Sequence, residues 1–350
     1  MCLPSSLAGG RSEWQPRHHR PQSLDGRHGR SLRCQVRRPH TDDTAAFQLA
    51  LSNFNQLGYG KLFVPYTGNP CYIKGFNASL APANVTGFSY ASPSLTITFS
   101  SGLQLPQWLF NFGVGAPATI YGVTTASGYN NFWTVTSVNG GATPSIVLYN
   151  TYGTSISGTP TLTSAYISIG LWTSAIVSIE GECTTRFSGG SCSGLTTVTT
   201  TTGVSESPIY LISSVPCTSN APTACQTTAQ QNTNALSVRN LDFKANQNKL
   251  TGGGLALGGV FIQGANGFEV YDDDFEGFSG SAYVAVSGAP LGAGAGLTLD
   301  GGGGGGNYDQ NGYVANNKFI NVEYGITTRN LVSSTTFVIN HVVCQSSTSN

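Results

Sequence analysis

Four seven-residue segments in the second half of the chain align with one another without gaps. They are SVRNLDF (237–243), EVYDDDF (269–275), YVANNKF (313–319) and FVINHVV (337–343). One column of the alignment holds valine, a second asparagine or aspartate, and a third phenylalanine or valine. Stacked strands produce such columns, because each repeat lies about 4.8 Å above its equivalent and turns its apolar residues inward. Asparagine suits the turn column, since it tolerates the left-handed conformation. The repeats therefore predict a β-solenoid.

Residues 43–57 have the pattern of one amphipathic helix. Apolar side chains recur at helical spacing, at Ala46, Phe47, Ala50, Leu51, Phe54 and Leu57. Asp42 or Asp43 can cap the N-terminus of this helix, and Gly58 follows its last turn. Residues 61–65 (KLFVP) then predict a short strand that a proline ends. The apolar face of the helix needs a partner that covers it.

The stretch TDDTAAFQLAL…GKLFVP (41–65) resembles the opening of the pectate-lyase-like superfamily, in the branch of rhamnogalacturonase or epimerase-type pectate lyase domains related to glycoside hydrolase 28. IVSIEGECTTRF (176–187) is similar to an early rung of that family. The resemblance covers residues 41–75 and, more loosely, 176–350. It implies an all-β fold, a right-handed parallel β-helix with an N-terminal capping helix. Hydrolases, lyases, epimerases and viral tailspikes share the motif, so it implies no single activity.

The body of the chain divides into three predicted regions. Residues 41–93 hold the capping helix and the first β-helix strands, and residues 173–350 hold the rungs. Between them, residues 94–172 alternate with β period and carry turn signals, which predicts a small inserted β-domain. Its aromatic residues form either the core of that domain or exposed platforms for sugar rings. These residues are Trp108, Phe110, Phe112, Phe132 and Trp133.

The two ends of the chain differ from its body. Residues 1–40 hold eight of the sixteen basic residues and show no apolar periodicity. We expect a basic, disordered segment, which is either a polyanion-binding arm or the product of a frame shift or misassigned start upstream of Thr41. At the other end the chain stops soon after a rung. A solenoid needs its last rung covered, so we expect a truncated product or an end that another chain covers.

Composition limits the classes of partner. Only 9% of the residues are charged, against roughly 25% in a typical soluble domain. Residues 41–350 carry a net charge of about −6, which argues against nucleic-acid binding. No apolar run is long enough to span a membrane. The pairs Cys183/Cys192 and Cys217/Cys225 flank short polar loops, and such spacings suit local disulfides in a secreted, extracellular protein.

Asp272, Asp273 and Asp274 form the main acidic cluster. In the repeat alignment Asp272 falls in the stacked asparagine column, which gives it a structural role. A second column contains Asp242, Asp274 and Lys318, and the adjacent column contains Asp273 and His341. We expect the side chains at Asp273 and Asp274 to face solvent. The candidate catalytic residues are therefore Asp242, Asp273, Asp274, Lys318 and His341.

Asp242 and Asp274 would lie roughly 5 Å apart if their segments were consecutive rungs. Carboxyl groups that close raise the pKa of one of them or bind a cation such as Ca²⁺. Paired acids can cleave a glycosidic bond. Alternatively, Ca²⁺ together with Lys318 can promote β-elimination next to a uronate carboxylate. A third interpretation is that this stripe is only a solvated face.

Two functions fit these observations. The first is an extracellular polysaccharide-active enzyme that cleaves an acidic glycan, pectin-like or capsular, by β-elimination or hydrolysis. The chain lacks the His-Gly, Arg-Ile-Lys and Asn-Thr-Asp motifs of polygalacturonases, so that particular activity is not indicated. The second is a non-catalytic, tailspike-like or cell-surface protein that binds glycans. Tailspike-like proteins usually trimerise, so the oligomeric state, monomer or homotrimer, separates the two.

Overall fold

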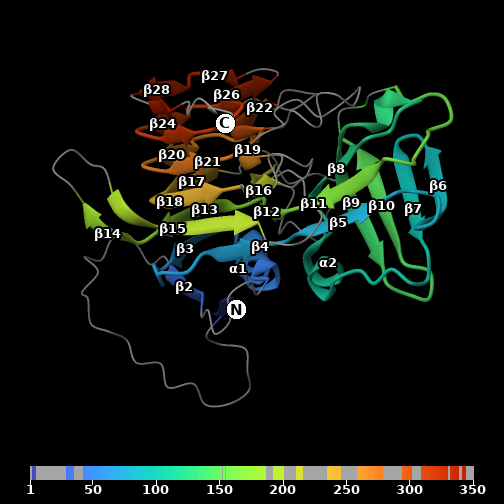
Figure 1. Cartoon of the computed structure of the whole chain (residues 1–350), viewed down its shortest axis with the longest axis horizontal. Helices are drawn as coiled ribbons and strands as arrows, with labels where there is room; N and C mark the ends of the chain where they lie inside the picture. Colours follow the sequence, from blue (N-terminus) through green and yellow to red (C-terminus); the bar gives the residue numbers. More distant parts are fainter. Residues whose placement is uncertain are drawn as a thin grey trace, which may run out of the picture.

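The computed structural model contains three mainly parallel β-sheets that share one core, with an antiparallel sheet beside them (Figure 1). The structure describes residues 2–4, 29–34, 42–151, 153, 155–186, 192–200, 210–215, 235–245, 258–278, 294–301, 309–329, 332–338 and 341–343. Within these ranges, no helix is long and apolar enough to cross a lipid bilayer.

Each of the three parallel sheets is built from strands that lie far apart in the sequence. In spatial order, sheet I contains β1 (Cys2–Pro4), β2 (Gly29–Cys34), β3 (Tyr59–Val64), β13 (Ile176–Gly181), β17 (Ala235–Arg239), β20 (Glu269–Tyr271), β24 (Tyr313–Ala315) and β28 (Thr336–Val338). Sheet II contains β14 (Cys183–Arg186), β15 (Cys192–Thr200), β18 (Leu241–Lys244), β21 (Asp274–Glu276), β25 (Lys318–Ile320) and β29 (His341–Val343), with β4 (Cys71–Ile73) also paired to β15. Sheet III contains β12 (Leu171–Thr173), β16 (Tyr210–Ser214), β19 (Gly258–Gln263), β22 (Ala295–Asp300) and β26 (Tyr324–Arg329).

The chain visits the three sheets in a fixed order. It passes from β17 to β18 to β19, then from β20 to β21 to β22, and then from β24 to β25 to β26. Each pass therefore adds one strand to sheets I, II and III in turn. Two short strands, β23 (Asp309–Gln310) and β27 (Val332–Ser333), pair in parallel between passes. Within residues 1–40, the strand β2 pairs in parallel with β3 and extends sheet I.

The register of the strands places the first three sequence repeats on top of one another. Val238 pairs with Val270, which pairs with Val314, and all three are buried. The rings of Phe243, Phe275 and Phe319 stack in sheet II, with centroids 5.2 and 5.1 Å apart. The turn column, Asn240, Asp272 and Asn316, has φ angles of 56°, 58° and 55°. These are the left-handed conformations that the column of asparagine and aspartate predicted.

The fourth repeat is shifted by one residue from its predicted position. Val314 pairs with Phe337 rather than Val338, and Phe319 pairs with Val342 rather than Val343. Either register fills the inward positions with apolar residues, so the apolar pattern does not choose between them. Asn340, which the sequence alignment matched to Asn316, lies outside the described residues.

Helix α1 (Thr44–Leu57) covers the N-terminal end of the parallel sheets. Its apolar face is buried in the core that the three sheets share, through Phe47, Ala50, Leu51 and Phe54. Asp42 Oδ1 accepts the Thr44 N–H at 3.0 Å at the start of the helix, while Asp43 Oδ2 binds the Tyr72 N–H at 3.1 Å. Gly58 ends the helix with a φ of 83°, as predicted.

The antiparallel sheet occupies the sequence between β4 and β12 (Figure 1). Its strands are β5 (Phe76–Ser79), β6 (Val85–Ala91), β7 (Ser94–Phe99), β8 (Pro117–Tyr121), β9 (Phe132–Asn139), β10 (Ser145–Asn150) and β11 (Tyr166–Ile169), with helix α2 (Gln107–Phe112) and the short 3₁₀ helix η1 (Ser127–Tyr129). Its first two strands precede residue 94, where the sequence placed the start of the insertion. The sheet packs against sheet III, where the Phe132 and Phe261 rings stack at 4.9 Å.

Candidate functional site

The register of sheet II brings four of the five predicted site residues into one column. Asp242 pairs with Asp274, Asp274 with Lys318, and Lys318 with His341. Neighbouring strands lie about 4.8 Å apart, so this column runs across the strands. The sequence placed His341 beside Asp273 instead, and the one-residue shift of the last repeat corrects that position.

Asp273 is not a solvent-facing residue, as the sequence analysis expected, but a fully buried one. Its Oδ1 accepts the Leu241 N–H at 2.9 Å, and its own N–H donates to Asn317 Oδ1 at 3.1 Å. Asn317 Nδ2 donates in turn to the Val270 carbonyl at 2.8 Å. Burial raises the pKa of Asp273 well above its usual value. These contacts join three successive passes, which is a structural role at the corner between sheets I and II.

Asp242 is a mostly buried carboxyl group that holds its proton more tightly than an exposed aspartate does. Burial raises the pKa of Asp242 to about 6, although Lys244 and the Thr197 hydroxyl oppose this and Asp274 adds to it. Both donors act on one oxygen: Thr197 Oγ1 lies 3.0 Å and Lys244 Nζ 3.3 Å from Oδ2. Oδ1 is buried and has no hydrogen-bond partner in the part of the chain that the structure describes. Near pH 6 this group can therefore both hold and release a proton.

Asp274 is affected by the charges of two lysines. Burial raises the pKa of Asp274, while the charges of Lys318 and Lys244 lower it. Lys244 Nζ also lies 2.8 Å from Glu276 Oε2. Burial alone would lower the pKa of Lys244, but its contacts with Glu276 and Asp242 raise it above the ordinary value. Lys244 is therefore a cation shared by two strands.

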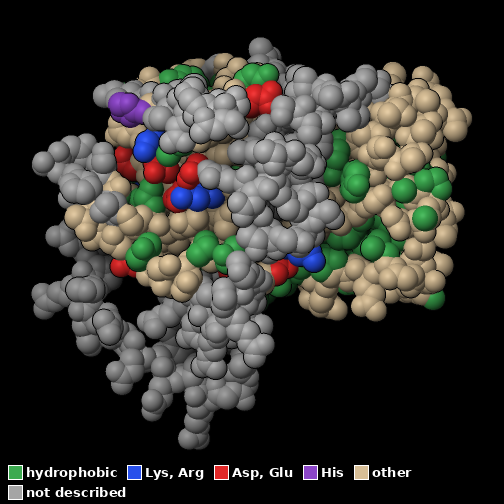
Figure 2. Space-filling view, in the orientation of Figure 1, with side chains coloured by type: hydrophobic (Ala, Val, Ile, Leu, Met, Phe, Trp, Pro, Cys, Tyr) green, Lys and Arg blue, Asp and Glu red, His purple; other side chains and the backbone are tan. Residues whose placement is uncertain are grey.

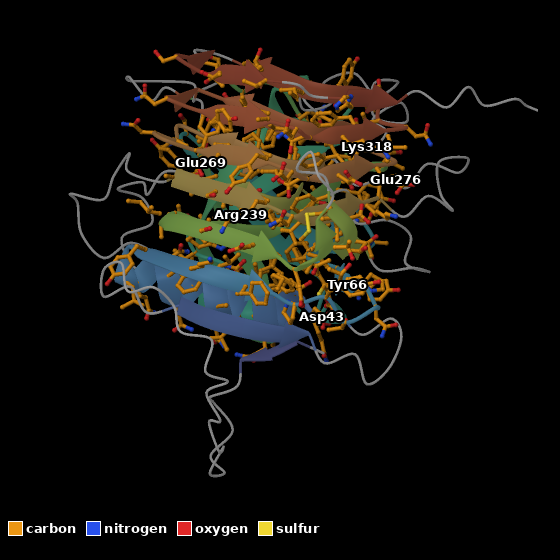
Figure 3. All side chains as sticks on the ribbon, turned by 90° about the vertical axis from the view of Figure 1, so that its left-hand side faces the viewer. Asp43, Tyr66, Arg239, Glu269, Glu276 and Lys318 are labelled. Atoms are coloured by element: carbon orange, nitrogen blue, oxygen red, sulfur yellow. A yellow bond between two sulfur atoms is a disulfide. The ribbon has the colours of Figure 1, made fainter. Side chains whose placement is uncertain are left out.

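A groove of about 380 Å³ lies over Asp242 and Asp274. One wall is the segment that joins β3 to β4, including the exposed ring of Tyr66. The other wall is the hairpin of β14 and β15, which the Cys183–Cys192 disulfide closes. Tyr66, Glu276 and Lys318 lie along the same side of the parallel sheets in Figure 3, and charged side chains gather over these sheets in Figure 2. The other predicted disulfide, Cys217 with Cys225, lies outside the described residues.

The predicted metal ligands, Asp242 and Asp274, do not form a larger cluster. The described ranges contain no group of three or more His, Cys, Asp or Glu side chains that could hold a metal ion. The position beside Asp242 Oδ2 already holds the Lys244 ammonium group. Ca²⁺ usually takes six to eight oxygen ligands. Asp242 and Asp274 together supply at most four of these oxygens.

Three residues of this site were absent from the sequence prediction. Lys244 and Glu276 follow Asp242 and Asp274 by two positions, and thus lie on the same face of their strands. Extending the repeat alignment by one residue would have found both. Thr197 lies on β15, opposite Asp242, and β15 belongs to a pass that the four repeats do not include. No signal in the alignment could have located Thr197.

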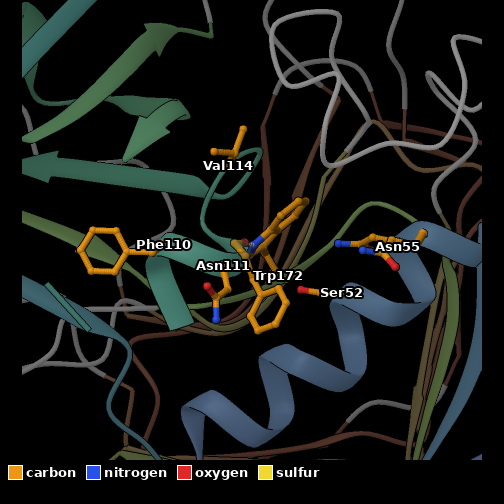
Figure 4. Close-up of a pocket in the computed structure, with 8 residues that line it drawn as sticks. Ser52, Asn55, Phe110, Asn111, Val114 and Trp172 are labelled. Atoms are coloured by element: carbon orange, nitrogen blue, oxygen red, sulfur yellow. Dashed lines mark hydrogen bonds between the residues drawn. The ribbon is translucent and has the colours of Figure 1, made fainter. Parts of the chain in front are cut away.

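The aromatic residues of the insertion divide into two groups. Trp108, Phe132 and Trp133 are buried in the core of the antiparallel sheet. Phe110 and Phe112 are half-buried and line a second, smaller cavity of about 160 Å³ between α1 and α2 (Figure 4).

Comparison with known proteins gives no family for the chain: no family profile matches it, and no curated protein matches its sequence.

Proposed function

We propose that this protein is a glycan hydrolase built on a right-handed parallel β-helix. The fixed order in which the chain visits sheets I, II and III supports the β-helix, with one pass as one rung. Crossovers between parallel strands are right-handed in about 98% of cases, which supports the hand. The helix α1 then acts as the N-terminal cap, as the resemblance to the pectate-lyase-like superfamily implies.

The single observation that carries the proposed activity is the Asp242–Asp274 pair on the floor of a groove. Hydrolysis of a glycosidic bond needs one carboxyl group that donates a proton to the leaving oxygen, and a second that activates water or attacks the sugar. Asp242, with a pKa of about 6, is the general acid. Asp274, beside the Lys318 and Lys244 ammonium groups, is the carboxylate.

The environment of Lys244 argues against this residue as the base of a β-elimination. Elimination needs a base that removes the proton next to a uronate carboxylate and a cation that stabilises the charge. Lys244 is held in its cationic form by Asp242 and Glu276, so it does not supply the base. Lys244 and Lys318 place ammonium groups beside the carboxyl groups of the site, and ammonium groups bind the carboxylates of an anionic glycan. The Cys183–Cys192 disulfide suits an oxidising, extracellular compartment.

The proposal is tested with the full chain on pectic, alginate-like and bacterial capsular glycans. New reducing ends and unsaturated products are measured together. Reducing ends without unsaturated products are expected, with activity that falls as pH rises through about 6. Asp242→Asn should lower the rate by at least about 10²-fold, the contribution of a general acid. Glu269→Gln, at an exposed acid on sheet I, is the matched control and should keep full activity.

The other outcomes select between the remaining functions. Unsaturated products that require Ca²⁺ would make the protein a lyase and overturn the role of Asp242. Binding of a glycan without any product would favour the non-catalytic, tailspike-like function. In that case, sedimentation of the same sample would show whether the protein is the homotrimer that such a function implies or a monomer.

A further inference from the structure

We propose that the cavity between α1 and α2, here called the notch, binds one neutral sugar ring. The notch shares no lining residue with the groove over Asp242 and Asp274. Its lining includes Ser52, Asn55 and Gln56 from α1, Phe110 and Phe112 from α2, and Trp172 from β12. This site is independent of the proposed hydrolase activity, since it uses other elements and other chemistry.

Asn55 supplies a hydrogen-bond donor that none of the described residues accepts. The side chain is only 5% exposed. Its Oδ1 accepts both the Thr173 hydroxyl, at 2.8 Å, and the Ser174 N–H, at 2.9 Å. The Ser174 N–H can only donate, so it fixes which end of the amide is the oxygen. The Nδ2 group then has no acceptor among the described residues, so it can donate a hydrogen bond to a ligand in the notch.

Ser52 supplies a second unused donor one turn earlier on the same face of α1. It is 7% exposed, and its Oγ accepts a hydrogen bond from Gln48 Nε2 at 3.2 Å. The described residues give its hydroxyl hydrogen no acceptor. Gln48 cannot turn to provide one, because its amide binds the Trp172 backbone at 3.0 and 3.1 Å. In Figure 4, Ser52 points across the notch toward Asn111 and Trp172.

The opposite side of the notch is aromatic. The half-buried Phe112 ring lies there, and Trp172 is held in place by its Nε1–H, which donates to the Phe112 carbonyl at 2.9 Å. The Phe110 ring points away from Trp172 in Figure 4. A pyranose ring has the matching chemistry: its C–H face packs on aromatic rings, and its hydroxyl oxygens accept hydrogen bonds. Small-molecule sites combine apolar walls with a few fixed polar groups in this way.

Charge and size narrow the ligand further. The residues that line the notch carry no charge, and it lies beside the C-terminal half of α1, where the helix dipole disfavours an anion. A neutral ligand is therefore favoured over a uronate. The volume of about 160 Å³ is below the roughly 300 Å³ at which sites for drug-sized ligands begin. The notch accordingly takes one ring, either a free monosaccharide or one unit of a chain.

The test is an NMR titration of the ¹⁵N-labelled full chain with methyl α-glucopyranoside, methyl α-mannopyranoside and methyl β-galactopyranoside. The Trp172 indole N–H signal, assigned with Trp172→Phe, should shift to saturation with at least one sugar. Ser52→Ala should weaken binding by roughly two- to tenfold, the value of one hydrogen bond. Asn55→Asp keeps the acceptor for Thr173 and Ser174 but loses the donor, and should weaken binding at least as much.

Gln104→Ala is the matched control, because Gln104 is an exposed amide just before α2 and outside the notch. It should leave the dissociation constant unchanged. The proposal fails if none of the three sugars gives a saturable shift, or if Ser52→Ala and Asn55→Asp bind like the parent protein. Tighter binding of methyl galacturonoside than of the neutral sugars would overturn the neutral ligand class. Asp242→Asn should not alter the titration, so failure here leaves the hydrolase proposal untouched.

Discussion

Replacing Phe275 with alanine would remove the middle ring of the column in sheet II. The Phe275 ring lies 5.2 Å from Phe243 and 5.1 Å from Phe319, and is fully buried. Unlike a ring at the end of the column, it contacts an aromatic neighbour on each side. The substitution therefore deletes both stacking contacts and opens a void in the shared core.

The cost follows from how poorly the surroundings can fill that void. Replacing a buried phenylalanine with alanine typically costs about 3–5 kcal/mol of stability, and the cost rises when the surrounding residues cannot fill the space. Two glycines of sheet III lie against the Phe275 side chain: a Cβ added at Gly259 would lie 2.7 Å from the Phe275 Cδ1, and one at Gly296 would lie 2.9 Å from the Phe275 Cβ. Glycines have no side chains that can move into the space. We therefore expect a loss of about 4–5 kcal/mol, with stacking contributing roughly 0.5–1.5 kcal/mol for each ring pair.

Urea unfolding at pH 7, followed by circular dichroism, measures this loss as a fall in the free energy of unfolding. If the alanine variant does not fold, Phe275→Leu is measured in its place. Leucine keeps part of the side-chain volume, so this substitution should cost roughly half as much stability. Tyr324→Ala is the control, because Tyr324 is 48% exposed and surface changes usually stay within about 0.5 kcal/mol. A loss below about 2 kcal/mol for Phe275→Ala would refute the argument that the ring column and the glycines facing it are packed without room to relax.

Three further predictions concern charge and the groove. Burial raises the pKa of Asp273, so the stability that its proton contributes is full below its usual pKa of 3.8 and falls as pH rises through the raised pKa. Asp273→Asn should flatten that fall above about pH 4 in urea melts. Lys244→Met removes a charge that lowers the pKa of Asp242, so glycan cleavage should extend to higher pH in a pH–rate profile. The double variant Cys183→Ser/Cys192→Ser should lose about 2–3 kcal/mol of stability, because the disulfide no longer restricts the unfolded chain. One wall of the groove is then free to move, so glycan cleavage should fall even where circular dichroism shows that the protein is still folded.

The columns at Val238, Val270 and Val314 could be predicted from the sequence because each residue has one role in every pass. A valine that faces inward and an asparagine in the left-handed conformation are both restricted by backbone geometry, so they recur at the same position. The register of the last pass could not be predicted, because Phe337 and Val338 are both apolar and the sequence pattern does not distinguish them. The position of His341 in the site depended on that register.

The burial of Asp273 was missed for a different reason. Side chains alternate between the two faces only while the strand continues, and the left-handed residue Asp272 bends the chain between β20 and β21. After that bend Asp273 turns inward, where the Leu241 N–H meets its carboxyl group. Asp274 begins the next strand and regains the outward position beside Asp242. Of two adjacent acids, only the second can therefore take part in chemistry at the surface.

The outer faces of the three parallel sheets differ in a way that places the site. The outer face of sheet III is covered by the antiparallel sheet, through contacts such as Phe132 with Phe261. On sheet I, Glu180 binds both Lys61 and Arg239, so these three outward residues form ion pairs with one another. Sheet II is the face on which buried carboxyl groups with raised pKa values line a groove. A solenoid repeats the same backbone on every pass, so the chemistry of this chain depends on which outward residues are left uncovered, and Asp242 and Asp274 meet that condition.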